Sequence, residues 1–209
     1  GQRVDVSADV SDYLGRSLHR GSGDLTLTLD NSHGRYDPGA EGAVALHLGG
    51  QVCLREGYVM ESGAEVVHQE PYWIAEIVHL VGAHSRAPGS HAPGGGPAVL
   101  LRTYDGWGKL WRSYADRAYE WQTSPALVLR EALERFGFVY SDDGSPSLYC
   151  AATPPRFSLG AGQPWGGLVE RLLDYSGCEL RFYVNADEEE TWPSARAHAF
   201  TPGDTACYA

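Results

Sequence analysis

The first half of the chain shows the alternation of apolar and polar positions that is typical of short strands. The pattern is clearest in residues 24–30, where three leucines alternate with threonines and so occupy one face. A turn cluster of Asp, Asn, Ser and Gly follows directly, at residues 30–34. Similar strand patterns recur in four further stretches: residues 52–58, 65–68, 72–81 and 98–104.

A run rich in glycine, proline, serine and histidine interrupts these strands. It covers residues 82–97 and offers almost no side chain that could be buried. We interpret it as a flexible hairpin connection. The strands and their closely spaced turns together predict an antiparallel meander that forms a small barrel or a sandwich.

The second half of the chain changes to a helical pattern. Ser124 and Pro125 favour a helix start, as the N-cap and the first helical position. Apolar residues then recur at helical spacing as far as Phe136, and Gly137 is a favourable stop. The predicted buried face of this helix comprises Ala126, Leu129, Ala132, Leu133 and Phe136.

A second helix is predicted over residues 164–176. Its spacing places Leu168, Leu172 and Tyr175 on the inward face, and Gly177 follows as the stop. The sequence therefore predicts two amphipathic helices in this half of the chain.

A strand and an acidic run follow the second helix and complete the predicted fold. Residues 179–184 alternate as a half-buried strand, and the acidic run at residues 187–190 is typical of a solvated hairpin tip. The fold class predicted is β-rich α+β. We expect an N-terminal antiparallel β-barrel-like domain at residues 1–115 and a smaller, incomplete α+β domain at residues 116–209.

The composition is that of a globular protein with an excess of acid. Of 209 residues 43% are hydrophobic, and 27 Asp and Glu outnumber 16 Lys and Arg, for a formal net charge of −11. This charge argues against a protein that grips a nucleic-acid backbone. No apolar stretch reaches the roughly 20 residues of a membrane span, so we expect no membrane insertion. The chain starts at Gly1 and stops abruptly at Ala209, which indicates a piece of a longer product.

No motif for catalysis, metal binding or cofactor binding emerges from the spacing of reactive residues. The histidines invite a metal hypothesis built on His68, His79 and His84, but they lack the spacing of defined ligand pairs. We expect no cofactor and no enzymatic activity. The cysteines lie too far apart for a zinc site, and we interpret them as buried thiols: Cys53, Cys150, Cys178 and Cys207.

The densest aromatic stretch contains Trp107, Trp111 and Trp121, with tyrosines between them. One interpretation is that these rings fill the seam between two domains, where large amphipathic side chains suit a half-buried junction. The other is a platform on which sugars stack, beside a pair of carboxylates. An open cleft with an exposed tryptophan beside two acids would identify the second.

Residues 25–38 resemble a segment of the tail proteins of long-tailed bacteriophages. In that family a run of the form T-h-T-L-D-N-x-x-G-R-[FY]-x-P ends an early strand of the hub. Shorter matches lie at residues 10–14, 52–58 and 101–110, and at residues 72–77, where Trp-Ile-Ala replaces the usual glycine. The structural or interface candidates in the main segment are Asp30, Asn31, Gly34, Tyr36 and Pro38.

The resemblance implies a baseplate-hub or tail-tip protein of the virion. Hubs of this family have a tube-forming β-barrel, an α/β domain and a second barrel, and this chain would stop before the second barrel. They form trimeric rings, so the implied partners are copies of the chain, distal tube proteins, the tape measure and tip proteins. DNA would pass through without specific binding, and the role would be structural. The alternative is an extracellular carbohydrate-binding or glycan-degrading tail-tip module.

Overall fold

The computed structural model describes residues 4–16, 20–60, 63–81, 97–149, 155–184 and 195–202, with the backbone alone at residues 55–60 and 63–69. The chain groups into two compact units. One contains residues 1–53 and 72–105, and the other contains residues 54–71 and 106–209. The domains predicted from the sequence, residues 1–115 and 116–209, are parts of the chain that would fold independently. These limits remain a prediction.

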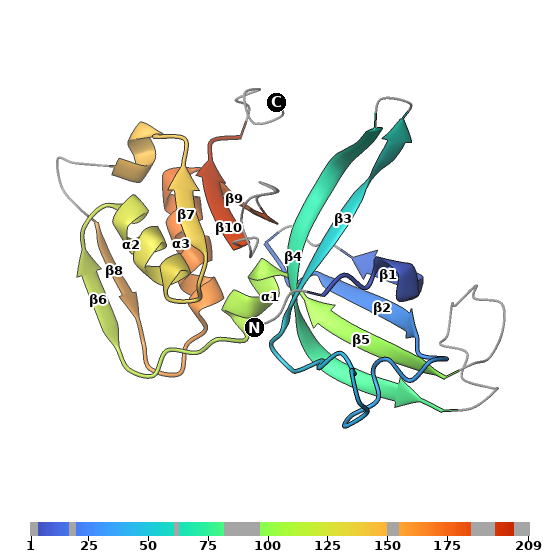
Figure 1. Ribbon diagram of the computed structural model, residues 1–209. Helices are drawn as coiled ribbons and strands as arrows, with labels where there is room; N and C mark the ends of the chain where they lie inside the picture. Colours follow the sequence, from blue (N-terminus) through green and yellow to red (C-terminus); the bar gives the residue numbers. More distant parts are fainter. Residues whose placement is uncertain are drawn as a thin grey trace. The chain divides into compact units, whose positions relative to one another are not determined.

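The first unit is built on a curled antiparallel sheet that forms a half-barrel (Figure 1). Its strand order is β1-β2-β5-β4-β3, so β1 and β3 are the two edges in the part of the chain that the structure describes. The predicted β-rich class is therefore confirmed. The strands are β1 (Val10–Arg16), β2 (Asp24–Asp30), β3 (Gln51–Met60), β4 (Gly63–Leu80) and β5 (Ala98–Tyr104).

The leucine face of β2 is the centre of this sheet's core. Leu25 and Leu29 are fully buried, and Leu27 is nearly so. They pair across the sheet with β5, where Leu27 lies opposite Leu101. The alternation seen in the sequence therefore marks the buried face correctly, because successive strand residues point to opposite sides of a sheet.

The strand β4 joins two predicted strands into one of 18 residues. Pro71 lies between the two predicted stretches, residues 65–68 and 72–81, and proline cannot donate to a strand ladder. The ladder between β4 and β5 begins only at Trp73, opposite Tyr104, so the missing amide of Pro71 does not interrupt it. Two separate strands were therefore the wrong prediction here.

The second unit combines helices with two small sheets. One sheet has the order β7-β10-β9, with β10 parallel to β7 and antiparallel to β9, and the other pairs β6 with β8. The helices are α1 (Gly106–Trp111), α2 (Pro125–Glu134) and α3 (Trp165–Ser176). The strands are β6 (Tyr119–Gln122), β7 (Val139–Asp142), β8 (Arg156–Leu159), β9 (Glu179–Val184) and β10 (Ala195–Phe200).

Both predicted helices are present, and both predicted stops hold. Gly137 and Gly177 have φ of 79° and 66°, a left-handed conformation that favours glycine. One inward residue was wrong: Tyr175 is 52% exposed, although Leu168 and Leu172 are fully buried. The buried stripe of α3 also includes Val169 and Leu173, which moves its centre about 90° from Tyr175 at 3.6 residues per turn.

In the described part of the chain, no helix combines the length and the apolar character needed to cross a membrane. The long glycine- and proline-rich stretch and the acidic run at residues 187–190 lie outside the described residues.

Candidate functional site

The loop after β2 is held in shape by the side chain of Asn31. Asn31 is 5% exposed, and its Oδ1 accepts the backbone N–H of Tyr36 at 2.9 Å. Its Nδ2 donates to Oδ1 of Asp37 at 2.7 Å. One buried amide therefore ties together both ends of a six-residue turn, as Asn side chains commonly do in loops.

Asp30 and Gly34 complete this turn. The carboxylate of Asp30 accepts the backbone N–H of Ser32 at 2.9 Å, and the amide of Gly34 donates to the carbonyl of Asn31 at 2.9 Å. Gly34 has a φ of 67°, where a side chain would be strained. Pro38 is exposed. Four of the five candidates from the phage-like segment thus shape one loop, and Pro38 is available at its surface.

Asp9 fastens this loop to the start of the chain. It ends a short 3-10 helix, Ser7–Asp9, directly before β1. Its carboxylate accepts the hydroxyl of Tyr36 and Nη1 of Arg35, while Nη2 of Arg35 donates to the carbonyl of Asp5 at 3.1 Å. Nothing in the sequence around Asp9 indicates this role, although Asp9 immediately precedes the short match at residues 10–14.

We call the group of Asp9, Arg35 and Tyr36 the latch. Tyr36 is its buried member, at 2% exposure. Burial and the hydrogen bond to the Asp9 carboxylate both raise the pKa of its phenol, and the Arg35 guanidinium opposes this only in part. The phenol therefore remains a proton donor to Asp9 throughout the neutral range.

The candidate Trp107 is a core residue of the second unit. It is 5% exposed, and its ring meets Phe182 of β9 edge to face, with centroids 6.0 Å apart. The preceding Gly106 has no room for a side chain, since a Cβ there would lie 2.3 Å from the Phe182 ring. A ring this enclosed is unavailable for stacking against a sugar.

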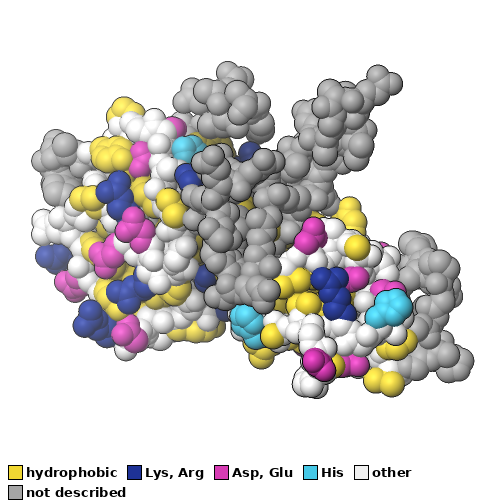
Figure 2. Space-filling model, in the orientation of Figure 1, with side chains coloured by type: hydrophobic (Ala, Val, Ile, Leu, Met, Phe, Trp, Pro, Cys, Tyr) yellow, Lys and Arg dark blue, Asp and Glu magenta, His cyan; other side chains and the backbone are white. Residues whose placement is uncertain are grey.

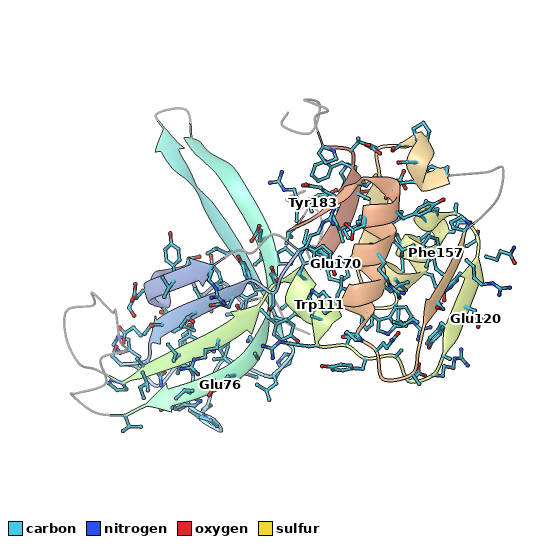
Figure 3. The ribbon with its side chains drawn as sticks, turned by 180° about the vertical axis from the view of Figure 1, so that it is seen from behind. Glu76, Trp111, Glu120, Phe157, Glu170 and Tyr183 are labelled. Atoms are coloured by element: carbon cyan, nitrogen blue, oxygen red, sulfur yellow. The ribbon has the colours of Figure 1, made fainter. Side chains whose placement is uncertain are left out.

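Trp111, at the other end of α1, joins α1 to α3 (Figure 3). A Cβ on Gly166 would lie 2.6 Å from its indole, so the ring rests directly on the α3 backbone. Trp111 is half-buried. Its position indicates helix–helix packing within the second unit.

Trp121 belongs to a separate aromatic cluster, formed where β6 faces α2 and α3. Its ring stacks on Tyr119 at 5.6 Å and 7° and meets Trp165 edge to face at 6.1 Å. Its Nε1 donates to the Glu131 carboxylate at 2.8 Å. The Arg135 guanidinium lies 5.0 Å from the rings of both Tyr119 and Trp165.

The three tryptophans therefore do not form one platform. Trp107 and Trp111 lie on α1, whereas Trp121 lies on β6. The ring contacts described above are all made inside the second unit. Whether these residues also fill a seam between domains remains a prediction. Partner rings and guanidinium groups occupy the surroundings that a stacked sugar would need, so the arrangement favours a packing role.

The residues considered for metal binding are only partly described. His79 lies exposed on β4, whereas His84 and the side chain of His68 fall outside the described part of the chain. Among the residues that the structure describes, no group of three or more His, Cys, Asp or Glu could hold a metal ion. Cys178 is fully buried, as predicted, and Cys53 is half-buried.

Comparison with known proteins places this fold among solved structures. No family model matches the sequence, and no curated protein matches it. One chain of a Francisella PdpA–VgrG complex aligns over 95% of this chain with a TM-score of 0.56 and 11% identity. The chain is similar to it in fold.

Two prophage tail proteins also align with the chain. The 43 kDa tail protein of prophage MuSo2 from Shewanella oneidensis covers 89% of it at 14% identity and a TM-score of 0.47. A prophage tail protein from Listeria monocytogenes covers 94% at 9% identity and a TM-score of 0.48. The chain spans 48%, 47% and 28% of the MuSo2, Listeria and PdpA–VgrG chains.

Proposed function

We propose that the chain is a structural component of a phage tail tip or baseplate hub. The observation that carries this proposal is the loop at residues 30–38, whose motif residues form a turn around the buried Asn31 and Tyr36 that Asp9 fastens to the sheet. The motif is therefore required by the fold of the first unit. The fold similarity to a chain of the PdpA–VgrG complex supports the same proposal.

The proposed role is mechanical. Copies of the chain assemble as a trimer into a ring that joins the tail tube to the tip, and the ring takes part in host attachment and DNA delivery. Its partners are the distal tube proteins, the tape measure and the tip proteins, and its location is the virion. The curled sheet of the first unit, expected to lie in a tube domain at residues 1–115, supplies the wall of the ring.

An acidic ring would let DNA slide through without adhering to it. The net charge of −11 supports this part of the proposal, because like charge prevents adhesion of a phosphate backbone. On the face of the second unit seen in Figure 2, acidic and basic side chains are interspersed. A ring whose acidic side chains cluster on the outside and whose lumen is basic would contradict the idea.

Native mass spectrometry and electron microscopy of the purified chain test the proposal. Ring-shaped particles whose mass is that of three copies, or of six where two rings pair, are the expected result. Antibodies against the chain should also label the tail tips of phage particles from the producing strain. Specific binding on a glycan array, or turnover of a glycan, with no ring and no tail labelling would support the carbohydrate-binding alternative instead.

A further inference from the structure

The edge strand β1 carries a leucine and a tyrosine whose side chains are both exposed. Leu14 is 71% exposed and Tyr13 is 51% exposed. No strand lies beyond β1 in the described part of the sheet. Natural proteins usually blunt such an edge with lysine, proline or a bulge. Here the one irregularity lies between Val10 and Asp12, which leaves residues 12–16 regular.

This edge is also held firmly in place. Asp9 fixes its start through Tyr36 and Arg35, and the hydroxyl of Ser11 donates to the carbonyl of Thr28 at 3.0 Å. Its end is fixed by Arg16, whose guanidinium lies 3.1 Å from the Asp24 carboxylate. A rigid edge is ordered in advance, so pairing with another strand costs little further entropy.

The sequence of the edge is complementary to itself. We propose that β1 pairs antiparallel with β1 of a second copy of this chain, about a two-fold axis at Leu14. In this register Leu14 lies opposite Leu14 of the second copy, and Asp12 lies opposite Arg16 twice. Both ion pairs are on one face, because residues two apart in a strand share a face.

The other face of the pair is complementary in shape. There Tyr13 lies opposite Gly15 of the second copy, and a Cβ on Gly15 would have its nearest neighbour, Leu25 Cδ1, at 3.7 Å. The tyrosine ring can therefore lie over the glycine, a pairing that favours both residues in sheets. Moving the axis by one residue, to Tyr13, would place Asp12 opposite Leu14 and remove both ion pairs.

The contact goes beyond the proposed function. It is isologous and closes into pairs, whereas a ring needs head-to-tail contacts, so the two give different masses. Arg16 can serve both carboxylates, since a guanidinium has five N–H donors and Asp24 uses only part of them. Leu14, Asp12 and Arg16 of one copy therefore face Leu14, Arg16 and Asp12 of the second copy, respectively.

Light scattering after size-exclusion chromatography tests the pairing. The wild-type chain at tens of micromolar should contain paired copies, six where the proposed rings form and two where they do not, and Leu14→Lys should halve the mass. Leu48→Lys is the matched control, since Leu48 is also exposed, at 66%, in the same unit but outside β1. The control should keep the wild-type mass.

Charge reversal tests the register itself. Asp12→Arg alone and Arg16→Asp alone should each halve the mass, because like charges then face each other twice. A mixture of the two variants should form a mixed dimer, since every pair is again of opposite charge. Circular dichroism on each variant confirms that it is folded.

Three outcomes would overturn the pairing. One is a monomeric wild-type chain, and another is a mixture of charge variants that stays monomeric although both are folded. The third is a trimer that is lost in Leu14→Lys, which would assign this edge to the ring and leave the proposed function intact. A dimer without any ring would support the pairing and contradict the proposed function.

Discussion

At the scale of single residues, the latch between Asp9 and Tyr36 links two parts of the first unit that the sequence separates by 27 positions. Tyr36→Phe removes the hydroxyl that donates to the Asp9 carboxylate and keeps the ring. A hydrogen bond to a charged group contributes about 1.5–3 kcal/mol, so we expect the free energy of unfolding at pH 8 to fall by about that amount. Urea denaturation measures the change.

The same substitution has a signature in pH. The pKa of Tyr36 is raised above its ordinary value of 10.0 in the folded state. The stabilisation from this phenol is therefore complete below pH 10 and is lost as the pH rises through the folded pKa. Between pH 9 and pH 11 the wild-type chain should lose more stability than Tyr36→Phe. Tyr175→Phe, at an exposed tyrosine, should follow the wild type.

At the scale of elements, the contact between α1 and α3 depends on Gly166, where the Trp111 ring rests directly on the α3 backbone. Gly166→Ala would place a Cβ 2.6 Å from the indole, whereas a Cβ on Gly167 would lie at an ordinary 3.7 Å. We expect Gly166→Ala to destabilise the chain by about 1–3 kcal/mol through overpacking. Gly167→Ala should be neutral or stabilising by up to about 1 kcal/mol, because alanine favours a helix. Thermal unfolding of both variants separates the two effects.

The elements also show what the sequence can predict. Strands β2 and β9 and both long helices follow directly from periodic leucines and from terminal glycines. Strand β10 was missed because alanine fills its buried positions, which gives no hydrophobic alternation strong enough to read. Strands β6, β7 and β8 have four residues each and are too short for a period to show.

The loop of the candidate site was predictable only in part, for a related reason. Asn31 and Gly34 favour a turn by their own conformational preferences, so the sequence predicts where the turn lies. Asp9 has no such local signal, because its partners Arg35 and Tyr36 lie 26 and 27 positions away. Only the folded chain brings that carboxylate to the phenol.

At the scale of the whole molecule, the first helix belongs to the second unit and opens its longer stretch, residues 106–209. Trp107 and Leu110 are buried, and Trp111 rests on α3, so α1 completes the core of this unit. A fragment of residues 106–209 should therefore unfold cooperatively. A fragment of residues 116–209 should lose several kcal/mol, since truncating one buried tryptophan already costs about 3–5 kcal/mol. Thermal unfolding by circular dichroism, with near-ultraviolet signals for fixed aromatic packing, compares the two. Equal stability of the fragments would instead support a domain limit at residue 115 and make α1 dispensable for this core.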